Sequence, residues 1–158
     1  FDITSKDANT QEFAGEVSVG PVTGNVALEI PVVKEKSGLI LGARSTYSDW
    51  ILKSLEEESL KNSEASFHDV LLKYNHKFSD QTSLKTTGYY SYDRFSITSD
   101  SLYNYRNLIF TLQADHRLNE KNQGSLILAN SNYNFNIEYD SQFNNNFTSG
   151  YTINETEA

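Results

Sequence analysis

Two classes of side chain alternate without interruption along Asn130-Ser131-Asn132-Tyr133-Asn134-Phe135-Asn136-Ile137. Successive side chains of an extended strand point to opposite faces. One face of this stretch is therefore a ladder of amides, and the other is mainly aromatic and aliphatic. A helix, with its period of 3.6 residues, would mix the two classes on every face. The stretch is predicted to be a β-strand.

This strand is the second arm of a hairpin that runs from Tyr105 to Tyr139, with a predicted turn at Asn119–Asn122. The first arm alternates more loosely: Leu108, Phe110, Leu112 and Ala114 oppose Asn107, Thr111, Gln113 and Asp115, and Ile109 is the exception. Both arms exceed the usual strand length of about five or six residues. A strand that crosses a membrane in a barrel needs about nine to eleven residues. The hairpin therefore fits either a barrel wall or a large soluble sheet with one wet face.

Further strands are predicted on both sides of the hairpin. Alternating patterns cover residues 13–19, 25–30, 39–47, 66–78, 84–97 and 147–155. Residues 1–6 also alternate and are predicted to form a short strand. Asp49 to Asn62 shows near-helical spacing, which predicts about two helical turns within a loop, with Asp49 as the N-cap. On the strand over residues 84–97 we expect Lys85, Thr87, Tyr89, Ser91 and Asp93 to face inward.

The connections between these strands fall into two sets. One set is tight and polar or charged: Lys34–Gly38, Ser79–Thr82 and Asn119–Asn122. The other set varies from a few residues to the long stretch around Asp49–Asn62. Tight turns at one rim and variable loops at the other are typical of outer-membrane barrels. The predicted fold class is all-β, an antiparallel up-and-down meander of about eight strands that is part of a larger transmembrane β-barrel.

Composition restricts the function. The 158 residues include no Cys, which excludes a disulfide framework, and a net charge of -8 argues against nucleic acid as a partner. No apolar run approaches the roughly 18 residues of a spanning helix. The chain has no Met and opens on Phe1, so we expect a mature form or a piece of something longer. Few aliphatic side chains, together with 10 Tyr and 9 Phe, suit strands with one apolar face.

The first third of the chain carries several short motifs in a fixed order. Residues 1–9, Phe-Asp-Ile-Thr-Ser-Lys-Asp-Ala-Asn, resemble the end of the plug domain of TonB-dependent outer-membrane receptors, with Ala8 where Gly is usual in that family. Residues 13–20, 28–32, 34–36 and 42–47 resemble in order the first barrel hairpin and the third strand. Ile30 replaces the common Gly before Pro31, and Ala43 an often basic residue. The remainder, from Trp50 to Ala158, matches in pattern only.

The resemblance implies that residues 1–10 end a plug domain and that residues 11–158 form the N-terminal part of an incomplete barrel. The barrels of such receptors have about 22 strands. The implied setting is the outer membrane of a Gram-negative bacterium, and the implied function is import of a nutrient such as a metal chelate, glycan or peptide. The implied partners are outer-membrane lipid, the rest of the barrel and plug, and an inner-membrane TonB-type energy-coupling protein. Candidates for an aromatic girdle are Trp50, Tyr90, Tyr92, Tyr133 and Phe135.

No enzyme, cofactor or metal site is expected. His68, His76 and His116 lack the spacing of a metal site, and a pairing of His116 with Ser125 across the hairpin is of a kind that arises by chance. Glu56-Glu57-Glu58 suits a solvated loop better than a metal-binding one. The candidate lumen-facing polar wall comprises Arg44, Lys73, Lys85, Asn130, Asn132, Asn134 and Asn136.

Two alternatives stay open. One is a complete small barrel of eight strands with a structural or adhesive role, although the chain ends without the aromatic residue that such barrels typically carry. The other is a soluble β-sandwich binding module, which makes Leu108, Phe110, Leu112, Tyr133 and Phe135 a sealed core. The fragment hypothesis predicts instead that this segment alone does not fold stably in water, because its sheet would have bare edges and an apolar outer face. A cooperatively melting monomer in plain buffer would contradict it.

Overall fold

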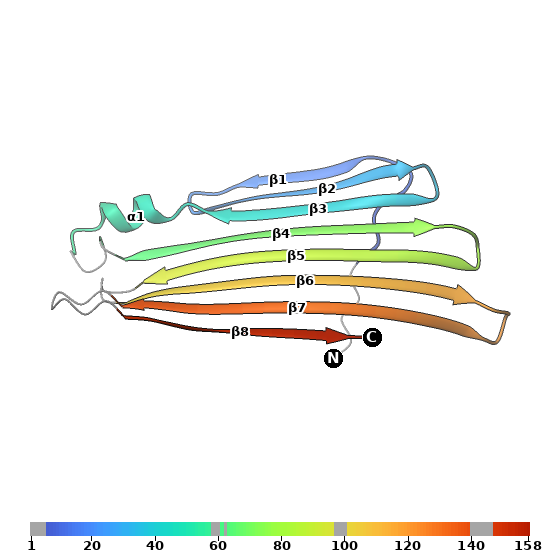
Figure 1. The fold of residues 1–158 in the computed structure, drawn as a ribbon. Coiled ribbons are helices and arrows are strands. Elements are labelled where there is room, and N and C mark those ends of the chain that lie inside the picture. Colours follow the sequence, from blue (N-terminus) through green and yellow to red (C-terminus); the bar gives the residue numbers. More distant parts are fainter. Residues whose placement is uncertain (1–5, 58–60, 62, 97–100, 140–146) are drawn as a thin grey trace.

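The computed structural model is one antiparallel sheet of eight strands in chain order, β1 to β8 (Figure 1). It describes residues 6–57, 61, 63–96, 101–139 and 147–158. The strands are β1 (Ala14–Val19), β2 (Thr23–Val33), β3 (Ser37–Thr46), β4 (Glu64–Lys77), β5 (Thr82–Ser96), β6 (Ser101–Arg117), β7 (Gln123–Tyr139) and β8 (Phe147–Glu157). The predicted all-β up-and-down meander is confirmed. The strand predicted over residues 1–6 falls almost wholly outside the described residues, and Lys6 is not in a strand.

The connections lie at two ends of the sheet. The tight turns at residues 34–36, 78–81 and 118–122 share one end, and the short helix α1 (Asp49–Ser54) lies at the other (Figure 1). The N-cap of α1 is Ser48, so the prediction of Asp49 as the cap was wrong by one residue. No helix among the described residues is long and apolar enough to span a membrane.

The register is continuous across the sheet, with one shift between Pro31 and Val33 at the end of β2. One row of directly opposed residues runs Leu28, Leu41, Leu72, Gly88, Phe110, Asn130. The neighbouring row on the other face runs Glu29, Ile40, Lys73, Thr87, Thr111, Ala129. Because side chains alternate within each strand, every residue can be assigned to one of two faces.

Residues 6–10 lie against the face that contains Lys73, which we name the docked face; the other is the bare face. The docked face carries charges in its central rows, including Glu29, Lys73 and Lys85. The bare face carries an uncharged apolar band. The band consists of Val26, Leu28 and Ile30 of β2, Leu39, Leu41 and Ala43 of β3, Val70, Leu72 and Tyr74 of β4, Leu84 and Tyr90 of β5, Leu108, Phe110, Leu112 and Ala114 of β6, and Leu126 and Leu128 of β7.

The sheet buries polar side chains and leaves apolar ones exposed. Among the described residues the only buried apolar residue is Ala8, whereas five polar or charged residues are buried, Lys73 among them. On the bare face, Leu108 is 51% exposed and Phe110 is 50% exposed. Ile109, the exception in the sequence pattern, lies on the docked face and is less exposed than both. The sheet therefore has no apolar core of its own.

The sealed core required by a β-sandwich is absent from the part of the chain that the structure describes. Leu108, Phe110 and Leu112 lie on the bare face, and Tyr133 and Phe135 lie on the docked face. These five residues cannot form one core across a single sheet. The sandwich prediction is wrong for this sheet.

Candidate functional site

The candidate site is the contact between residues 6–10 and the docked face, near the tight turns of β2–β3 and β4–β5. Asp7 is its centre. One carboxylate oxygen of Asp7 lies 3.1 Å from Lys73 Nζ, and the other lies 2.9 Å from Lys85 Nζ. β4 and β5 are paired so that Lys73 and Lys85 lie one row apart on the same face. The sheet thus presents two ammonium groups to one carboxylate.

Lys73 is held in place by more than this ion pair. Its side chain is 5% exposed, and its Nζ also donates a hydrogen bond to the backbone oxygen of Lys6 at 2.6 Å. A buried ammonium is costly unless it is paired and hydrogen-bonded. Residues 6–7 supply both kinds of partner, so the burial of Lys73 depends on the docking of this segment.

Side chains of the sheet also bind the backbone of the segment. The amide of Ala8 donates to Asn75 Oδ1, and the amide of Asn9 donates to Glu29 Oε2, each at 2.9 Å. A further ion pair joins Lys6 Nζ to Glu29 at 2.5 Å. These contacts satisfy backbone donors that docking would otherwise remove from water. They fix the segment across β2 and β4.

Gly38 makes this close approach possible. A Cβ on Gly38 would lie 2.7 Å from the backbone oxygen of Asn9 and 2.8 Å from Ala8 Cβ. Real Cβ atoms do not approach backbone this closely, so a larger residue would displace the segment. Beside it, the amide of Glu35 in the β2–β3 turn donates to the oxygen of Thr10 at 2.9 Å.

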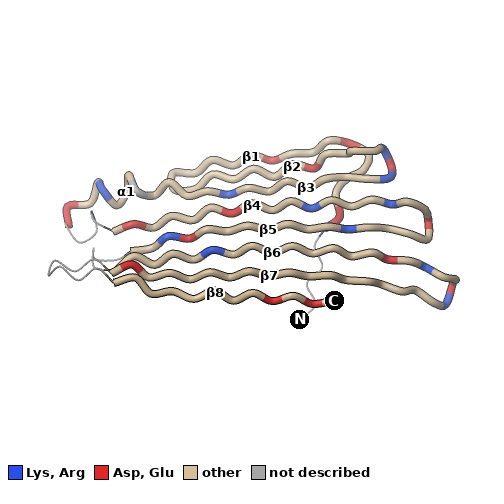
Figure 2. Tube along the Cα trace, in the orientation of Figure 1, with Lys and Arg blue, Asp and Glu red and all other residues tan. Residues whose placement is uncertain are grey.

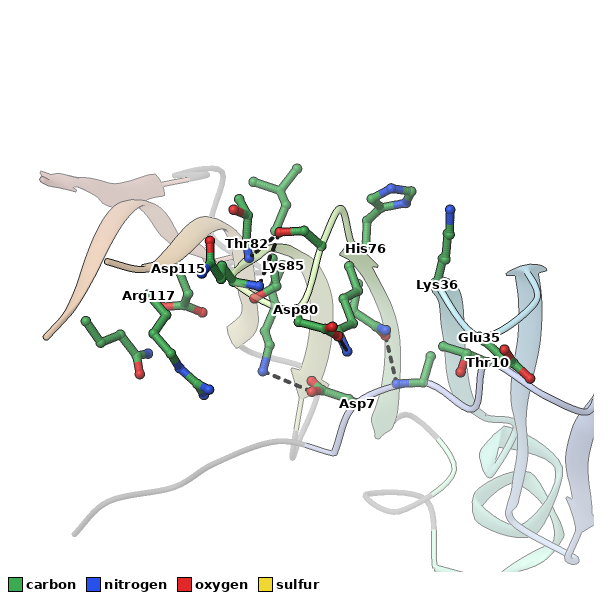
Figure 3. A pocket seen from close by; sticks show the side chains of 18 residues that line it. Asp7, Thr10, Glu35, Lys36, His76, Asp80, Thr82, Lys85, Asp115 and Arg117 are labelled. Atoms are coloured by element: carbon green, nitrogen blue, oxygen red, sulfur yellow. Dashed lines mark hydrogen bonds and ion pairs between the residues drawn. The ribbon is translucent and has the colours of Figure 1, made fainter. Parts of the chain in front are cut away.

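A hollow of about 390 Å³ lies beside Asp7, between the segment and the turn of β4–β5 (Figure 3). Asp80, Asp115 and Arg117 line it together with Asp7 and Lys85. Its lining mixes both signs of charge and has no aromatic ring other than His76. Among the described residues no group of three or more His, Cys, Asp or Glu is placed to hold a metal ion. The geometry suits electrostatic attachment of a segment.

The seven residues of the predicted polar wall do not form one surface. Lys73 and Lys85 meet at Asp7, and Arg44 lies on the same face but pairs with Asp69 at 2.8 Å and covers the Phe67 ring. Asn130, Asn132, Asn134 and Asn136 lie on the bare face instead, opposite Phe110, Leu108, Arg106 and Asn104. The single wall predicted from sequence is therefore two groups separated by the sheet.

Other sequence predictions are also divided by the two faces. Of the girdle candidates, Tyr90 and Tyr92 lie on the bare face, whereas Tyr133 and Phe135 lie on the docked face, where Phe135 contacts Tyr105 and Tyr151. The His116 side chain is hydrogen-bonded to Thr82, and Ser125 on the opposite face donates a hydrogen bond to Asp115. His116 and Ser125 therefore do not pair with each other. Glu58 of the acidic run lies outside the described residues.

The sequence interpretation missed Asp7, Asn75, Glu29 and Gly38 as site residues. Gly38 stood only as the end of a turn, and Asp7 as part of a plug-like motif. The available signal was one Lys on each of two adjacent predicted strands, because two neighbouring ammonium groups favour a nearby carboxylate. Comparison with known proteins adds nothing: no family model, no curated protein and no solved structure matches the chain.

Removing the Asp7 charge is expected to release the segment. In Asp7→Asn the buried Lys73 loses the Asp7 carboxylate. Loss of one partner of a buried ion pair costs several kcal/mol, and the partial exposure of Asp7 reduces that cost. The amides of Ala8 and Asn9 should therefore exchange with deuterium at least about tenfold faster. The measurement is residue-resolved hydrogen exchange. Asp80→Asn is the matched control, because Asp80 pairs with Lys77 on the exposed turn. Equal exchange in both variants would contradict the role of Asp7.

The pH dependence of docking follows from the Asp7 carboxyl. Partial burial raises its pKa, but hydrogen bonds and charges from Lys85 and Lys73 outweigh burial and hold the pKa below the ordinary 3.8. A lowered folded-state pKa means that this stabilisation is present above pH 3.8 and is lost as pH falls through the folded pKa. We expect a carbon-13 titration of the Asp7 carboxyl to have its midpoint below 3.8, and Lys85→Gln to move it upward. A midpoint unchanged by that substitution would contradict the pairing.

Proposed function

We propose that this chain is wall and adjoining plug end of an energy-coupled outer-membrane transporter of the TonB-dependent type. The observation that carries the proposal is the sidedness of the sheet. A partly exposed apolar band without Lys, Arg, Asp or Glu crosses the middle of the bare face, while the docked face carries charges in the neighbouring rows. Strands of outer-membrane barrels alternate in this way between lipid and a polar interior. On this proposal the bare face contacts lipid.

The height and slope of the band support the proposal. On β6 it runs from Leu108 to Ala114, about 20 Å along a strand, compared with a lipid-facing band about 25 Å tall. It also crosses the sheet obliquely. The row through Leu28 and Leu41 reaches β7 at Asn130, whereas the apolar residues of β7, Leu126 and Leu128, lie closer to the tight turn. A level membrane band drawn across tilted barrel strands would also slope relative to the rows of paired residues.

The open edges support a barrel larger than eight strands. β1 pairs only with β2 and β8 only with β7 among the described strands. Long unpaired edges are avoided in stable proteins, and closure removes them. In the proposed transporter, β1 and β8 pair with further strands of a wall of about 22.

The Asp7 contact would have a role in the proposed transporter. Residues 6–10 would be the last part of the plug, attached to the inner wall at the rim of tight turns. Loops at the α1 end would face outside and capture a nutrient, and an inner-membrane partner would then displace the plug. The attachment through Lys73 and Lys85 holds the plug end in place during that displacement.

The test is a charge placed on one face or the other of the same strand. In the intact gene product, Phe110→Arg puts a guanidinium into the band at an expected cost of about 2–4 kcal/mol, so assembly in the outer membrane should fall several-fold. Thr111→Arg, the matched control, places the same group on the docked face and should be tolerated. Membrane fractionation and heat-modifiable electrophoretic migration report assembly. Normal assembly of Phe110→Arg, or recovery of the wild type as a soluble protein, would contradict the proposal.

A further inference from the structure

Aromatic side chains gather on the docked face toward the α1 end of the sheet. One row of directly opposed residues runs Phe67, Asp93, Tyr105, Phe135, Tyr151 across β4 to β8. The ring centroids of Tyr105 and Phe135 lie 5.0 Å apart, and those of Phe135 and Tyr151 lie 5.3 Å apart. We name these five residues the aromatic row. Residues 6–10 contact the docked face nearer the tight turns, toward the other end of the sheet.

Asp93 is the charged member of the aromatic row, and its neighbours on the docked face are mostly aromatic. Phe67 and Tyr105 oppose it on β4 and β6. Phe95, the next residue of β5 on this face, is 43% exposed and pairs with Tyr103 of β6. Among the described residues, no hydrogen bond or ion pair reaches the half-buried Asp93 carboxylate. A carboxylate that is partly removed from water and has no partner favours a cation beside it.

A neighbouring group of residues on the same face already holds a cation in this way. The Arg44 guanidinium lies 2.8 Å from a carboxylate oxygen of Asp69 and 4.9 Å from the centroid of the Phe67 ring. A cation within about 6 Å of a ring centroid is attracted by the negative face of the ring. Arg44 thus contacts one carboxylate and one ring together. Asp93 and Tyr105 repeat this combination on β5 and β6, and no basic side chain of the described residues pairs with Asp93.

The docked face is negatively charged toward the α1 end. From the row of Asp69 to the strand ends near α1, the described strands carry three charged side chains on this face, Arg44, Asp69 and Asp93. Arg44 neutralises Asp69, so the charge of Asp93 remains. Figure 2 shows acidic or basic residues on β3, β4 and β5 toward α1, and a long stretch of β7 without charge. A positively charged ligand therefore suits this surface better than an anion.

We infer that Asp93 and the rings around it bind a methylated ammonium group carried by a small organic ligand. A primary ammonium has three N–H donors to satisfy, whereas a quaternary ammonium has none. Phe67 and Phe95 offer no hydrogen-bond acceptor, so the surroundings of Asp93 favour the methylated group, which aromatic rings also recognise. This inference rests on the proposed function, in which the docked face lines the barrel interior. It narrows the imported nutrient to a small organic cation.

The test uses the intact gene product in mild detergent, with choline as the probe and isothermal titration calorimetry as the measurement. The control ligand is dimethylbutanol, the uncharged isostere of choline in which carbon replaces the nitrogen. Choline should bind about tenfold more tightly than dimethylbutanol, because only the charged ligand is attracted by the carboxylate and the ring faces. Equal affinity for the two ligands would overturn the inference.

Substitutions separate the role of the carboxylate from that of the rings. Asp93→Asn keeps the shape of the side chain and removes its charge, so it should abolish the preference for choline over dimethylbutanol. Tyr105→Leu should weaken choline binding about threefold, and Tyr105→Phe should retain it, because the ring makes the contact. The matched control is Glu138→Gln, which removes a carboxylate at the same end of the sheet but on the bare face. An equal loss of preference in Glu138→Gln would overturn the inference.

The proposed function and this inference fail in different experiments. If the wild type does not fractionate with the outer membrane, the proposed function fails, and the choline preference of the purified protein still tests the role of Asp93. If the wild type fractionates normally and Asp93→Asn keeps the wild-type preference for choline, this inference alone is refuted.

Discussion

The backbone register from β2 to β7, shifted only between Pro31 and Val33, determines which side chains share a face of the sheet. Each strand carries two classes of side chain at alternate positions, and hydrogen-bonded pairing fixes which class faces which. A slip of one residue in β2, β4 or β5 would move Glu29, Lys73 or Lys85 onto the apolar band and the apolar residues of that strand onto the docked face. The register therefore brings Lys73 and Lys85 together and keeps every charge out of the band.

The side chains on the two faces of the sheet favour different solvents. The docked face buries Lys73 and satisfies it with Asp7 and the Lys6 backbone, whereas the bare face leaves Phe110 and Leu108 half exposed. In water the second arrangement would be unfavourable by about 25 cal/mol for each Å² of apolar surface left exposed. In lipid the same surface is at no disadvantage. The proposed location, with a membrane on the bare side and a polar interior on the other, would satisfy both faces.

The sequence predicts the strands, their alternation and the meander, because period-two patterns are local and strong. It does not predict how faces combine across a turn. The predicted turn at Asn119–Asn122 would pair Leu118 with Gln123. That register would place Asn130 on the same face as Asn107 and Thr111. The actual connection also includes Leu118, so that Arg117 pairs with Gln123 and Asn130 shares the face of Phe110. One residue in the turn thus reverses the assignment of the whole amide ladder.

Asp7 was not predicted as a site residue for a different reason. It contacts the sheet through residues distant in sequence, and no local pattern indicates such contacts.

On the proposed function the bare face contacts lipid and the docked face does not, and a cysteine scan along β6 distinguishes the two faces. These 158 residues contain no Cys, so a single Cys at each of positions 107 to 112 can carry an environment-sensitive fluorophore once any Cys elsewhere in the intact protein has been replaced. We expect a lipid-dissolved nitroxide to quench the label at 108, 110 and 112 and to spare it at 107, 109 and 111. Uniform quenching along the strand, or quenching at the odd positions instead, would contradict it.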